Sequence, residues 1–399
     1  MLARLLEHPS TDTFDITVLV RDANKAKILE SQFGVNAVVG THQDLDKIES
    51  LVENAHAVFH LVSRRLITDY AWHIRIFSPV HLAARPGRHR AHQCHLERYA
   101  QATRRAWRSP HPNPHCKLVA SSAVWLSTLT YADQNTPLWQ SETSVLADDA
   151  RGMYITDTVY DDLNVQQMKS LRPTAHPRPV DLLITEADTQ GYLHAHIVLP
   201  LLIYGVASQA LVRAGVSHST SIQIPTLIRA ALDRGQAGMI GQGKSLWPDV
   251  HIDDSECPPS SLQLAQPAQS FGNVSLISGC VHTVANLYVL IFDTAVRDPE
   301  AAGHDWEGFY LGESGEHTWY LVSKVIGYVL VGHGISNDPE QTGVQGWGSN
   351  SRARGRRARA IGWEPTHTAE DMQTSIPPEV EALVKQRRET LWRHRCGTS

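Results

Sequence analysis

The sequence predicts an α/β protein with a doubly wound parallel sheet, and three observations predict it. Runs rich in β-branched residues alternate with helix-like runs over residues 1–61, which is the pattern of βαβ units. The apolar run at residues 195–205, AHIVLPLLIYG, contains Pro and ends in Gly, as expected for a central strand that helices cover on both faces. The 399-residue chain, 42% hydrophobic, is long enough for a sizeable core and a second, smaller lobe.

The expected elements follow one another at short spacing. Helices are expected over residues 2–6, 23–32 and 45–54, and strands over residues 15–22, 35–39 and 57–61. The run at 195–205 adds a buried strand, Ile197 to Leu199, that stops at Pro200. Ligands bind at the carboxyl ends of strands in such sheets, so we expect the chemistry of the protein there.

Composition excludes some classes of partner. The formal net charge of −5 gives no general reason to expect binding to nucleic acid or to an anionic membrane. No apolar run is long enough to span a bilayer, and the start MLARLLEHPS lacks the apolar core of a secretory signal. We therefore expect a cytoplasmic protein with a small-molecule substrate and no nucleic-acid or membrane partner.

Four segments together carry a resemblance to one superfamily. They are the alternating elements from Asp15 to Leu61, the segment HIVLPLLIYG, the motif Val250–Asp254, and the closing segment Asn350–Pro365. In this order they resemble the extended and atypical short-chain dehydrogenase/reductases, in their NAD-dependent epimerase/dehydratase and NmrA-like branches. The resemblance implies a Rossmann-like domain, a smaller C-terminal substrate lobe, and NAD(P) as cofactor.

The resemblance also divides the chain. It implies that residues 1–62 and 143–203 form the cofactor domain, and that residues 204–254 and 284–399 form the substrate lobe. The superfamily begins with a strand and a Gly-rich turn that binds the pyrophosphate, whereas this sequence has no Gly-x-x-Gly-x-x-Gly near its N-terminus. We therefore expect a chain that is truncated at its N-terminus and lacks the principal phosphate site.

Two stretches interrupt the pattern. Residues 63–142 hold seven histidines, ten arginines and four acidic residues without sustained periodicity, and residues 255–283 separate motifs that the superfamily joins directly. We interpret both as anomalous inserts, either inserted or wrongly translated sequence, and expect neither to pack well. The cysteines and histidines of the first stretch have the residue types of a zinc site but no Cys-x-x-Cys pair, so no metal is expected.

The resemblance implies cofactor contacts at three strand ends. Arg21 lies where an arginine would meet the 2′-phosphate of NADP, which slightly favours NADP; Asp22 is the rival ribose ligand, and a solvated strand-end charge is the other interpretation. The other predicted cofactor-binding residues are His60, Leu61 and Val62 near the adenine ribose, and Pro200, Ile203 and Tyr204 near the nicotinamide. His60 could equally be a core histidine.

No catalytic residue can be assigned. In the superfamily a Tyr-x-x-x-Lys helix performs proton transfer, and it should precede the strand at 197–199; there the segment Pro179–Ala187 carries neither residue. The pair Tyr320 and Lys324 has the spacing but lies in the substrate lobe, where we interpret it as structural. The serine-bearing strand of the superfamily is expected just before Val145, although Lys117–Val124 also resembles it.

These observations support three hypotheses. The leading one is an NAD(P)-dependent oxidoreductase, epimerase or dehydratase acting on a small carbonyl or sugar-like substrate, with a homodimer as one possibility. The alternative is a non-catalytic, NmrA-like dinucleotide-binding regulatory protein, and the third is a non-functional product of a defective gene model. The sequence leaves the substrate, the reaction direction and the choice between NAD and NADP open.

Overall fold

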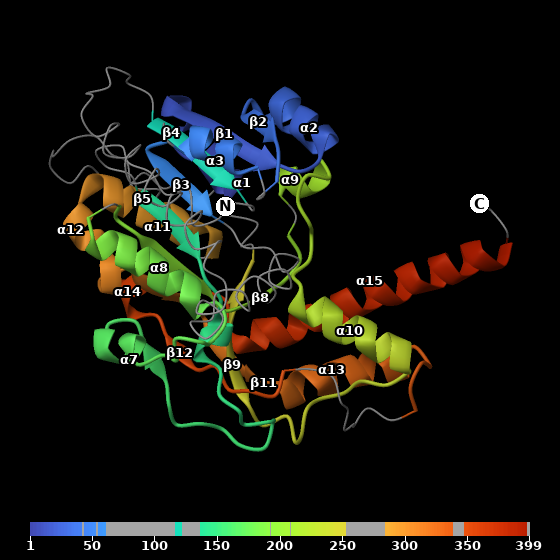
Figure 1. The fold of residues 1–399 in the computed structure, drawn as a ribbon. Helices are drawn as coiled ribbons and strands as arrows, with labels where there is room; N and C mark the ends of the chain where they lie inside the picture. The colour runs from blue at the N-terminus through green and yellow to red at the C-terminus, as the bar shows by residue number, and fades with distance from the viewer. Residues whose placement is uncertain are drawn as a thin grey trace, which may run out of the picture.

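The structure, a computed structural model, describes residues 1–41, 44–52, 55–60, 116–121, 136–191, 193–207, 209–252, 284–337 and 347–396. These residues form a larger lobe around a parallel sheet and a smaller lobe beside it (Figure 1). In the part of the chain so described, no helix is both long and apolar enough to cross a membrane.

The larger lobe contains a seven-stranded sheet. Its strands are β1 (Phe14–Val20), β2 (Asn36–Val39), β3 (Ala57–His60), β4 (Cys116–Ser121), β5 (Thr136–Gln140), β7 (His196–Pro200) and β10 (Phe309–Gly312). They lie in the order β10-β7-β5-β3-β4-β1-β2, and every neighbouring pair is parallel. All strand carboxyl ends therefore meet at one edge of the sheet.

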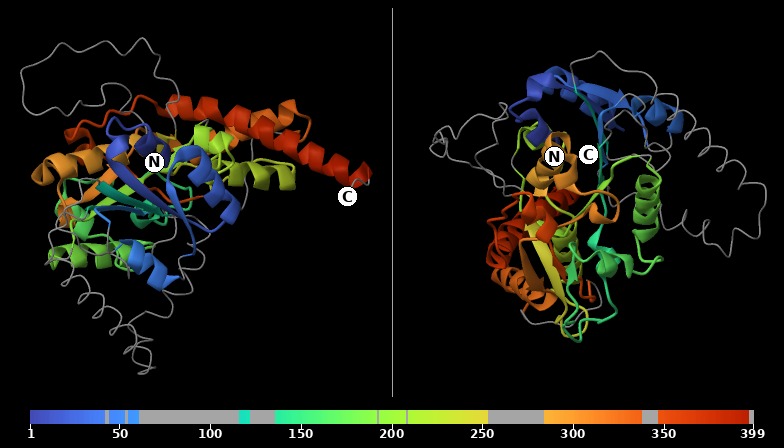
Figure 2. Two further views of the ribbon diagram at one scale, coloured as in Figure 1. Left: turned by 90° about the horizontal axis from the view of Figure 1, so that it is seen from above. Right: turned by 90° about the vertical axis from the view of Figure 1, so that its left-hand side faces the viewer.

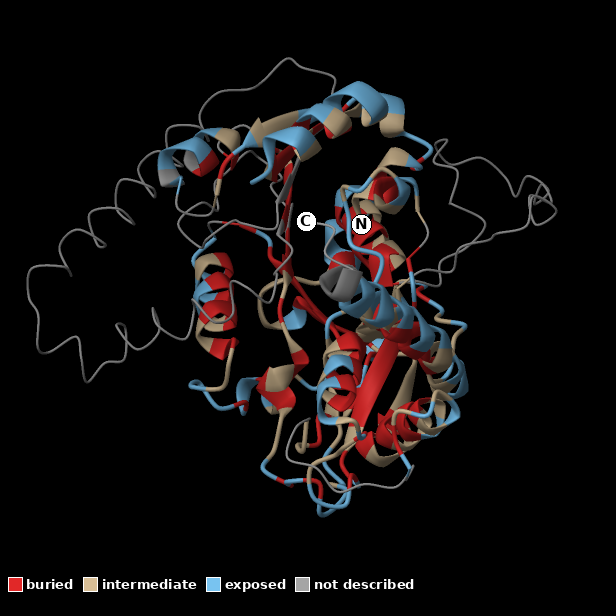
Figure 3. Cartoon of the chain, turned by 90° about the vertical axis from the view of Figure 1, so that its right-hand side faces the viewer, coloured by how far each residue is buried: buried red, intermediate tan, exposed pale blue. Residues whose placement is uncertain are grey.

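Helices cover both faces of this sheet. Strand β7 shows why: Val198 packs toward α11 (Val284–Arg297), whereas Ile197 and Leu199 pack toward α8 (Arg178–Thr189). All five residues of β7 are buried, which explains its continuous apolar run. Buried residues, red in Figure 3, lie in the interior of both lobes. Helices α1 (Leu2–Leu6) and α2 (Ala23–Phe33) belong to the core of the α11 face, and α3 (Leu45–Val52) packs on Leu19 and Val58. The predicted doubly wound α/β fold is confirmed.

The smaller lobe has its own sheet and core. Strands β8 (Leu202–Tyr204), β9 (Leu246–His251) and β11 (Gly315–Thr318) lie in the order β11-β9-β8. Helices α10 (Gln223–Arg234), α13 (Trp319–Gly332) and α15 (Ala369–Cys396) pack on them, and α15 extends beyond the lobe (Figure 2). The remaining elements are η1 (Thr11–Thr13), η3 (Thr143–Leu146), β6 (Tyr160–Asp161), α7 (Val165–Lys169), α9 (Ala210–Arg213), α12 (Pro299–Ala302), η5 (Asp305–Glu307), β12 (Ala353–Arg354) and α14 (Arg356–Ala360).

Two segments differ from the predicted division of the chain. Residues 116–121 and 136–140, expected to belong to an insert, form β4 and β5 of the large sheet. Strand β4 pairs with β1 on one side and β3 on the other, so it satisfies backbone groups that both neighbours would otherwise leave unpaired. The rest of the expected inserts, residues 63–115, 122–135 and 255–283, lie outside the described residues.

The boundary of the smaller lobe also differs. Helix α11 and strand β10 were expected in the substrate lobe, but β10 pairs with β7, and α11 packs against the large sheet. The reason is their apolar character: Phe309, Tyr310 and Leu311 are all buried, and a strand with two apolar faces needs cover on both sides. Helix α11 and strand β10 therefore belong to the larger lobe, although they follow segments of the smaller lobe in the sequence.

Candidate functional site

Arg21 and Asp22 lie at the carboxyl end of β1. The Asp22 carboxylate caps α2: its Oδ1 accepts hydrogen bonds from the backbone N–H of Asn24 (2.7 Å) and Lys25 (3.3 Å). Arg21 is exposed directly before this cap. The local structure thus gives Asp22 a structural role and leaves the Arg21 guanidinium at the ligand-binding edge of the sheet.

The predicted nicotinamide-side residues follow β7. Pro200 ends β7, and Ile203 and Tyr204 lie in β8. The Tyr204 side chain is buried in the smaller lobe, where its hydroxyl donates to the Thr368 carbonyl (3.1 Å). This segment therefore offers its backbone, rather than the Tyr204 ring, to a ligand at the sheet edge.

Gly205 closes this turn against a neighbouring ring. It has a φ of +94°, and a Cβ added there would lie 2.5 Å from His251 Nε2. Only glycine combines that backbone angle with so close an approach. The end of β8 and the end of β9 are thereby held together.

The predicted residues near the adenine ribose are only partly described. His60 is the last residue of β3, whereas Leu61 and Val62 lie outside the described residues. The strand between β3 and β1 is β4. The sequence after β4 contains no glycine before Gly152, so a Gly-rich phosphate turn does not follow this strand.

A polar cluster gathers at the carboxyl end of β5, next to the end of β7. Ser141 extends the pairing of these strands, since its backbone N–H donates to the Val198 carbonyl (2.8 Å). The Ser141 hydroxyl donates to Asp181 Oδ2 in the first turns of α8 (3.0 Å). Next to this pair, Glu142 Oε2 lies 3.9 Å from His176 Nδ1. Four polar side chains therefore meet at the edge where doubly wound sheets bind their ligands.

Burial sets the charge of this cluster. It raises the pKa of Asp181 to about 7, with Glu142 adding to the effect and the Ser141 hydrogen bond and Arg178 opposing it. Burial likewise lowers the pKa of His176, which favours a neutral imidazole. Perturbed titratable groups of this kind are a feature of functional sites.

Sequence analysis missed these residues for an identifiable reason. The segment Pro179–Ala187 is helical, as predicted, and was expected to supply a Tyr–Lys pair, so its Asp181 attracted no attention. Ser141 lies directly after β5, just before Val145, where the serine-bearing strand was expected. The available signal was an acidic residue among the apolar positions of the helix, since α8 buries Asp181, and also Asp188, beside Val180 and Ile184.

The Tyr–Lys pair at the family spacing lies elsewhere. Lys324 Nζ is 3.4 Å from the Tyr320 hydroxyl on α13, in the smaller lobe, one helical turn apart. Within the described residues, no group of three or more His, Cys, Asp or Glu side chains could hold a metal ion. The cluster around Ser141 and Asp181 is therefore the strongest candidate site.

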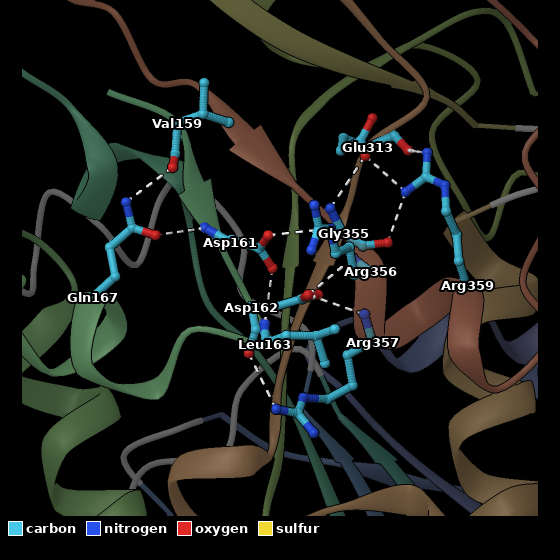
Figure 4. A network of polar contacts seen from close by, with 10 residues as sticks. All are labelled: Val159, Asp161, Asp162, Leu163, Gln167, Glu313, Gly355, Arg356, Arg357 and Arg359. Carbon is cyan, nitrogen blue, oxygen red and sulfur yellow. Dashed lines mark hydrogen bonds and ion pairs between the residues drawn. The ribbon is translucent and has the colours of Figure 1, made fainter. Parts of the chain in front are cut away.

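A second buried aspartate organises a structural network (Figure 4). Asp162 Oδ1 accepts the backbone N–H groups of Arg356 (2.8 Å) and Arg357 (2.9 Å), and its Oδ2 accepts that of Leu311 (3.1 Å). Burial raises the pKa of Asp162 to about 6, against the effect of these three hydrogen bonds. The carboxylate joins the start of α14 to the edge strand β10.

No family model matches the chain. Among curated proteins, the oxidase ucsJ of Acremonium sp is 24% identical over 200 residues, which cover 45% of this chain. The match spans 47% of that protein, so the chain aligns with about half the length of this relative.

Solved structures match nearly the whole chain. The dTDP-glucose 4,6-dehydratase DesIV of Streptomyces venezuelae, with NAD and TYD bound, has a TM-score of 0.52 at 13% identity, covering 96% of this chain and 92% of that one. The UDP-glucose-4-epimerase of Stenotrophomonas maltophila, with bound NAD and formylated UDP-arabinopyranose, has a TM-score of 0.50 at 12% identity and 96% coverage of each chain. The predicted resemblance is thus confirmed at the level of the fold: the chain has the fold of the NAD-dependent epimerases and dehydratases of the extended short-chain dehydrogenase/reductase superfamily.

Proposed function

We propose that this protein is an NAD(P)-dependent oxidoreductase that acts on a small carbonyl or sugar-like substrate. The observation that carries the proposal is the cluster of Ser141, Glu142, His176 and Asp181 at the carboxyl ends of β5 and β7. In a doubly wound sheet this edge binds the ligand, and these side chains can hold and move a proton there. The fold and the oxidase relative support a redox reaction.

The residues present fit a dinucleotide at its two ends. Exposed Arg21 suits the adenosine end and its positive charge favours the 2′-phosphate of NADP, while the backbone around Pro200 and Ile203 suits the nicotinamide end. When bound, the nicotinamide supplies or accepts the hydride. The chain contributes the rest: Ser141 and Asp181 hold each other in place behind the more exposed Glu142 and His176.

The non-catalytic alternative rests on two observations. The helix α8 carries no Tyr–Lys pair, and no glycine-rich sequence follows β4, which lies between β3 and β1. A dinucleotide-binding regulatory protein requires neither rapid turnover nor a proton donor. Tight binding of NADPH with no oxidation or reduction across a carbonyl and alcohol panel would favour this alternative over the enzyme.

Cofactor binding and turnover test the proposal directly. We expect calorimetric titration of the full chain to detect NADPH and NADH binding, and a panel of aldehydes, ketones, free sugars and secondary alcohols to give a change in nicotinamide absorbance. Absence of binding by both cofactors to the folded, soluble protein would overturn the proposed function. A homodimer remains a prediction, which the mass of the protein in solution tests.

The preference for NADP depends on Arg21. Replacing Arg21→Ala removes the charge that would meet the 2′-phosphate, so we expect NADPH affinity to fall about tenfold and NADH affinity to stay unchanged. Arg229→Ala, which removes an exposed arginine from α10 in the smaller lobe, is the matched control. An equal loss for both cofactors in Arg21→Ala would contradict the NADP preference.

A further inference from the structure

We propose that residues 206–220 form a strap that encloses the bound dinucleotide, and that Lys25 and Leu211 are positioning residues that hold the strap in place. All residues of the strap except Ser208 are described. The inference rests on the proposed function and names the residues that retain the cofactor. It follows from where the strap begins, from how its tip is anchored, and from the two cofactor ends that it connects.

The base of the strap is closed by contacts within the chain. Strand β8 is followed by Gly205, whose φ of +94° lets the chain turn at this point. Val206 and Thr220 then form an antiparallel bridge, and the Ala207 N–H donates to the Ser219 carbonyl (2.7 Å). The residues between them therefore project from the end of β8 as a single loop.

The tip of the strap is anchored on the larger lobe. Helix α9 carries Leu211, which is buried in the same hydrophobic core cluster as Leu29 of α2. The N–H groups of Val216 and Ser217 both donate to the Leu211 carbonyl (2.9 and 3.1 Å), which folds the tip back on itself. The strap thus starts at the smaller lobe and ends beside α2 (Figure 1).

Lys25 tethers the same tip. Its Nζ donates to the Val216 carbonyl (2.7 Å) in a partly buried, charge-assisted hydrogen bond. Lys25 lies in the first turn of α2, where a positive charge is unfavourable because the helix N-terminus is itself partly positive. The stability of α2 therefore does not explain a lysine at this position, whereas the contact with the strap does.

The strap connects the two proposed ends of the cofactor site. Its base lies just after β8, which contains Ile203 of the nicotinamide end. Its tip contacts α2 at Lys25, four positions after Arg21 of the adenosine end. A dinucleotide bound at both ends lies along the same edge of the sheet as the strap, so the strap opens when the cofactor enters or leaves. Opening breaks the Lys25 hydrogen bond and exposes Leu211.

The dissociation rate of the cofactor tests the strap. A strap that encloses a ligand slows its release, so a loosened strap changes the dissociation rate more than the association rate. We expect Leu211→Ala and Lys25→Met each to release both NADH and NADPH about tenfold faster. Stopped-flow fluorescence of the reduced nicotinamide measures this rate when an excess of the oxidised cofactor displaces it.

Three further variants separate the strap from other effects. Arg21→Ala should affect NADPH alone, whereas the strap variants should affect both cofactors equally, because the strap follows the part that both share. Lys25→Arg keeps a cationic donor and should restore slow release. Leu227→Ala removes a leucine that, like Leu211, is less than a tenth exposed, but from the core of the smaller lobe, and it should leave both rates unchanged.

Hydrogen exchange gives a second readout that requires no turnover. The amide hydrogens of Ala207, Val216 and Ser217 are hydrogen-bonded within the strap. We expect NADH and NADPH to slow their exchange in the unmodified protein, because a bound cofactor disfavours opening, and to slow it much less in Leu211→Ala.

Three outcomes would overturn the inference. If folded Leu211→Ala releases both cofactors at the unmodified rate, the strap does not enclose the cofactor, and the proposed function stands without it. If Lys25→Met changes NADPH release alone, Lys25 binds the 2′-phosphate and is not a tether. If the unmodified, folded protein binds neither cofactor, the proposed function fails and the inference fails with it. Circular dichroism establishes folding, and Lys25→Met keeps the test decisive if Leu211→Ala does not fold.

Discussion

Asp162 and Asp181 are both buried in the larger lobe, yet their surroundings differ. Three backbone N–H groups satisfy the Asp162 carboxylate, and they come from residues about 150 to 195 positions away in sequence. Asp181 accepts one hydrogen bond, from Ser141, and its Oδ1 has no hydrogen-bond partner among the described residues. Burial raises the pKa of both, but that of Asp181 reaches the higher value.

The comparison separates stability from function. A carboxylate whose oxygens are saturated by backbone donors stabilises the strands and helices that it joins. A buried carboxyl with an unmatched oxygen costs stability, and such groups persist where chemistry needs them. On this basis Asp162 is a structural residue, and Asp181 belongs to the candidate site.

The largest effect is expected at Asp162. Asp162→Ala leaves three N–H groups without this acceptor, one buried (Leu311) and two part-buried (Arg356 and Arg357), so we expect the free energy of unfolding to fall by about 3–5 kcal/mol. Urea denaturation measures this loss. The neighbouring Asp161→Ala, which removes a carboxylate paired with half-exposed Arg356, should cost about 1 kcal/mol or less. If the two variants lost equal free energy of unfolding, the Asp162 hydrogen bonds would stabilise the fold no more than the Asp161–Arg356 ion pair does.

A gain in stability is expected at Asp181. Its folded-state pKa of about 7 lies above that of an unfolded aspartate, so stability falls as pH rises between about 4 and 7 and stays low above this range. Asp181→Asn keeps an oxygen that can accept from Ser141 and removes the buried charge. We expect it to raise the free energy of unfolding at pH 8 by roughly 1–3 kcal/mol and to change nothing at pH 4.

Thermal unfolding of Asp181→Asn at pH 4 and at pH 8 checks that expectation. A loss of stability at pH 8 would mean that the ionised carboxylate is well compensated, and the contrast with Asp162 would disappear.

The smallest effect is expected at the edge of the Asp162 network. Arg359 Nη1 donates to Glu313 Oε1 and to the Gly355 carbonyl, both at 2.7 Å (Figure 4). Because Arg359 is 40% exposed, Arg359→Ala should lower the free energy of unfolding at pH 7 by only about 1 kcal/mol. At pH 4, where Glu313 is largely protonated, the same denaturation experiment should show a smaller loss. If Arg359→Ala lowered the free energy of unfolding as much as Asp162→Ala, the Arg359–Glu313 pair would stabilise the position of α14 as strongly as Asp162 does.

Much of the larger lobe could be predicted from local pattern. The strand at Phe14–Val20, the helix at Ala23–Phe33 and the buried strand at His196–Pro200 were all expected within about two residues of their observed bounds. The two strands depend on short-range signals, namely a run of β-branched residues and a proline that ends an apolar run.

The position of β4 and the polar networks could not be predicted in this way, because they depend on contacts between residues that are distant in sequence. The segment Lys117–Val124 resembles a superfamily strand, but only the pairing with β1 and β3 places Cys116–Ser121 inside the large sheet. The Asp162 network joins segments almost 200 residues apart, and the Ser141–Asp181 bond crosses from a strand end to a helix start. Polar residues of this kind become visible only when the sheet brings them together.

The position of β4 has a consequence for how the protein is made. During synthesis β1, β2 and β3 leave the ribosome first, but β1 and β3 are not neighbours; residues Cys116–Ser121 lie between them in the sheet. The large sheet can therefore become continuous only after β4 has been synthesised, and β4 begins more than fifty residues after the end of β3. Until β4 is made, the edges of β1 and β3 that it will pair with stay unpaired in the nascent chain, and exposed strand edges of this kind favour aggregation during folding.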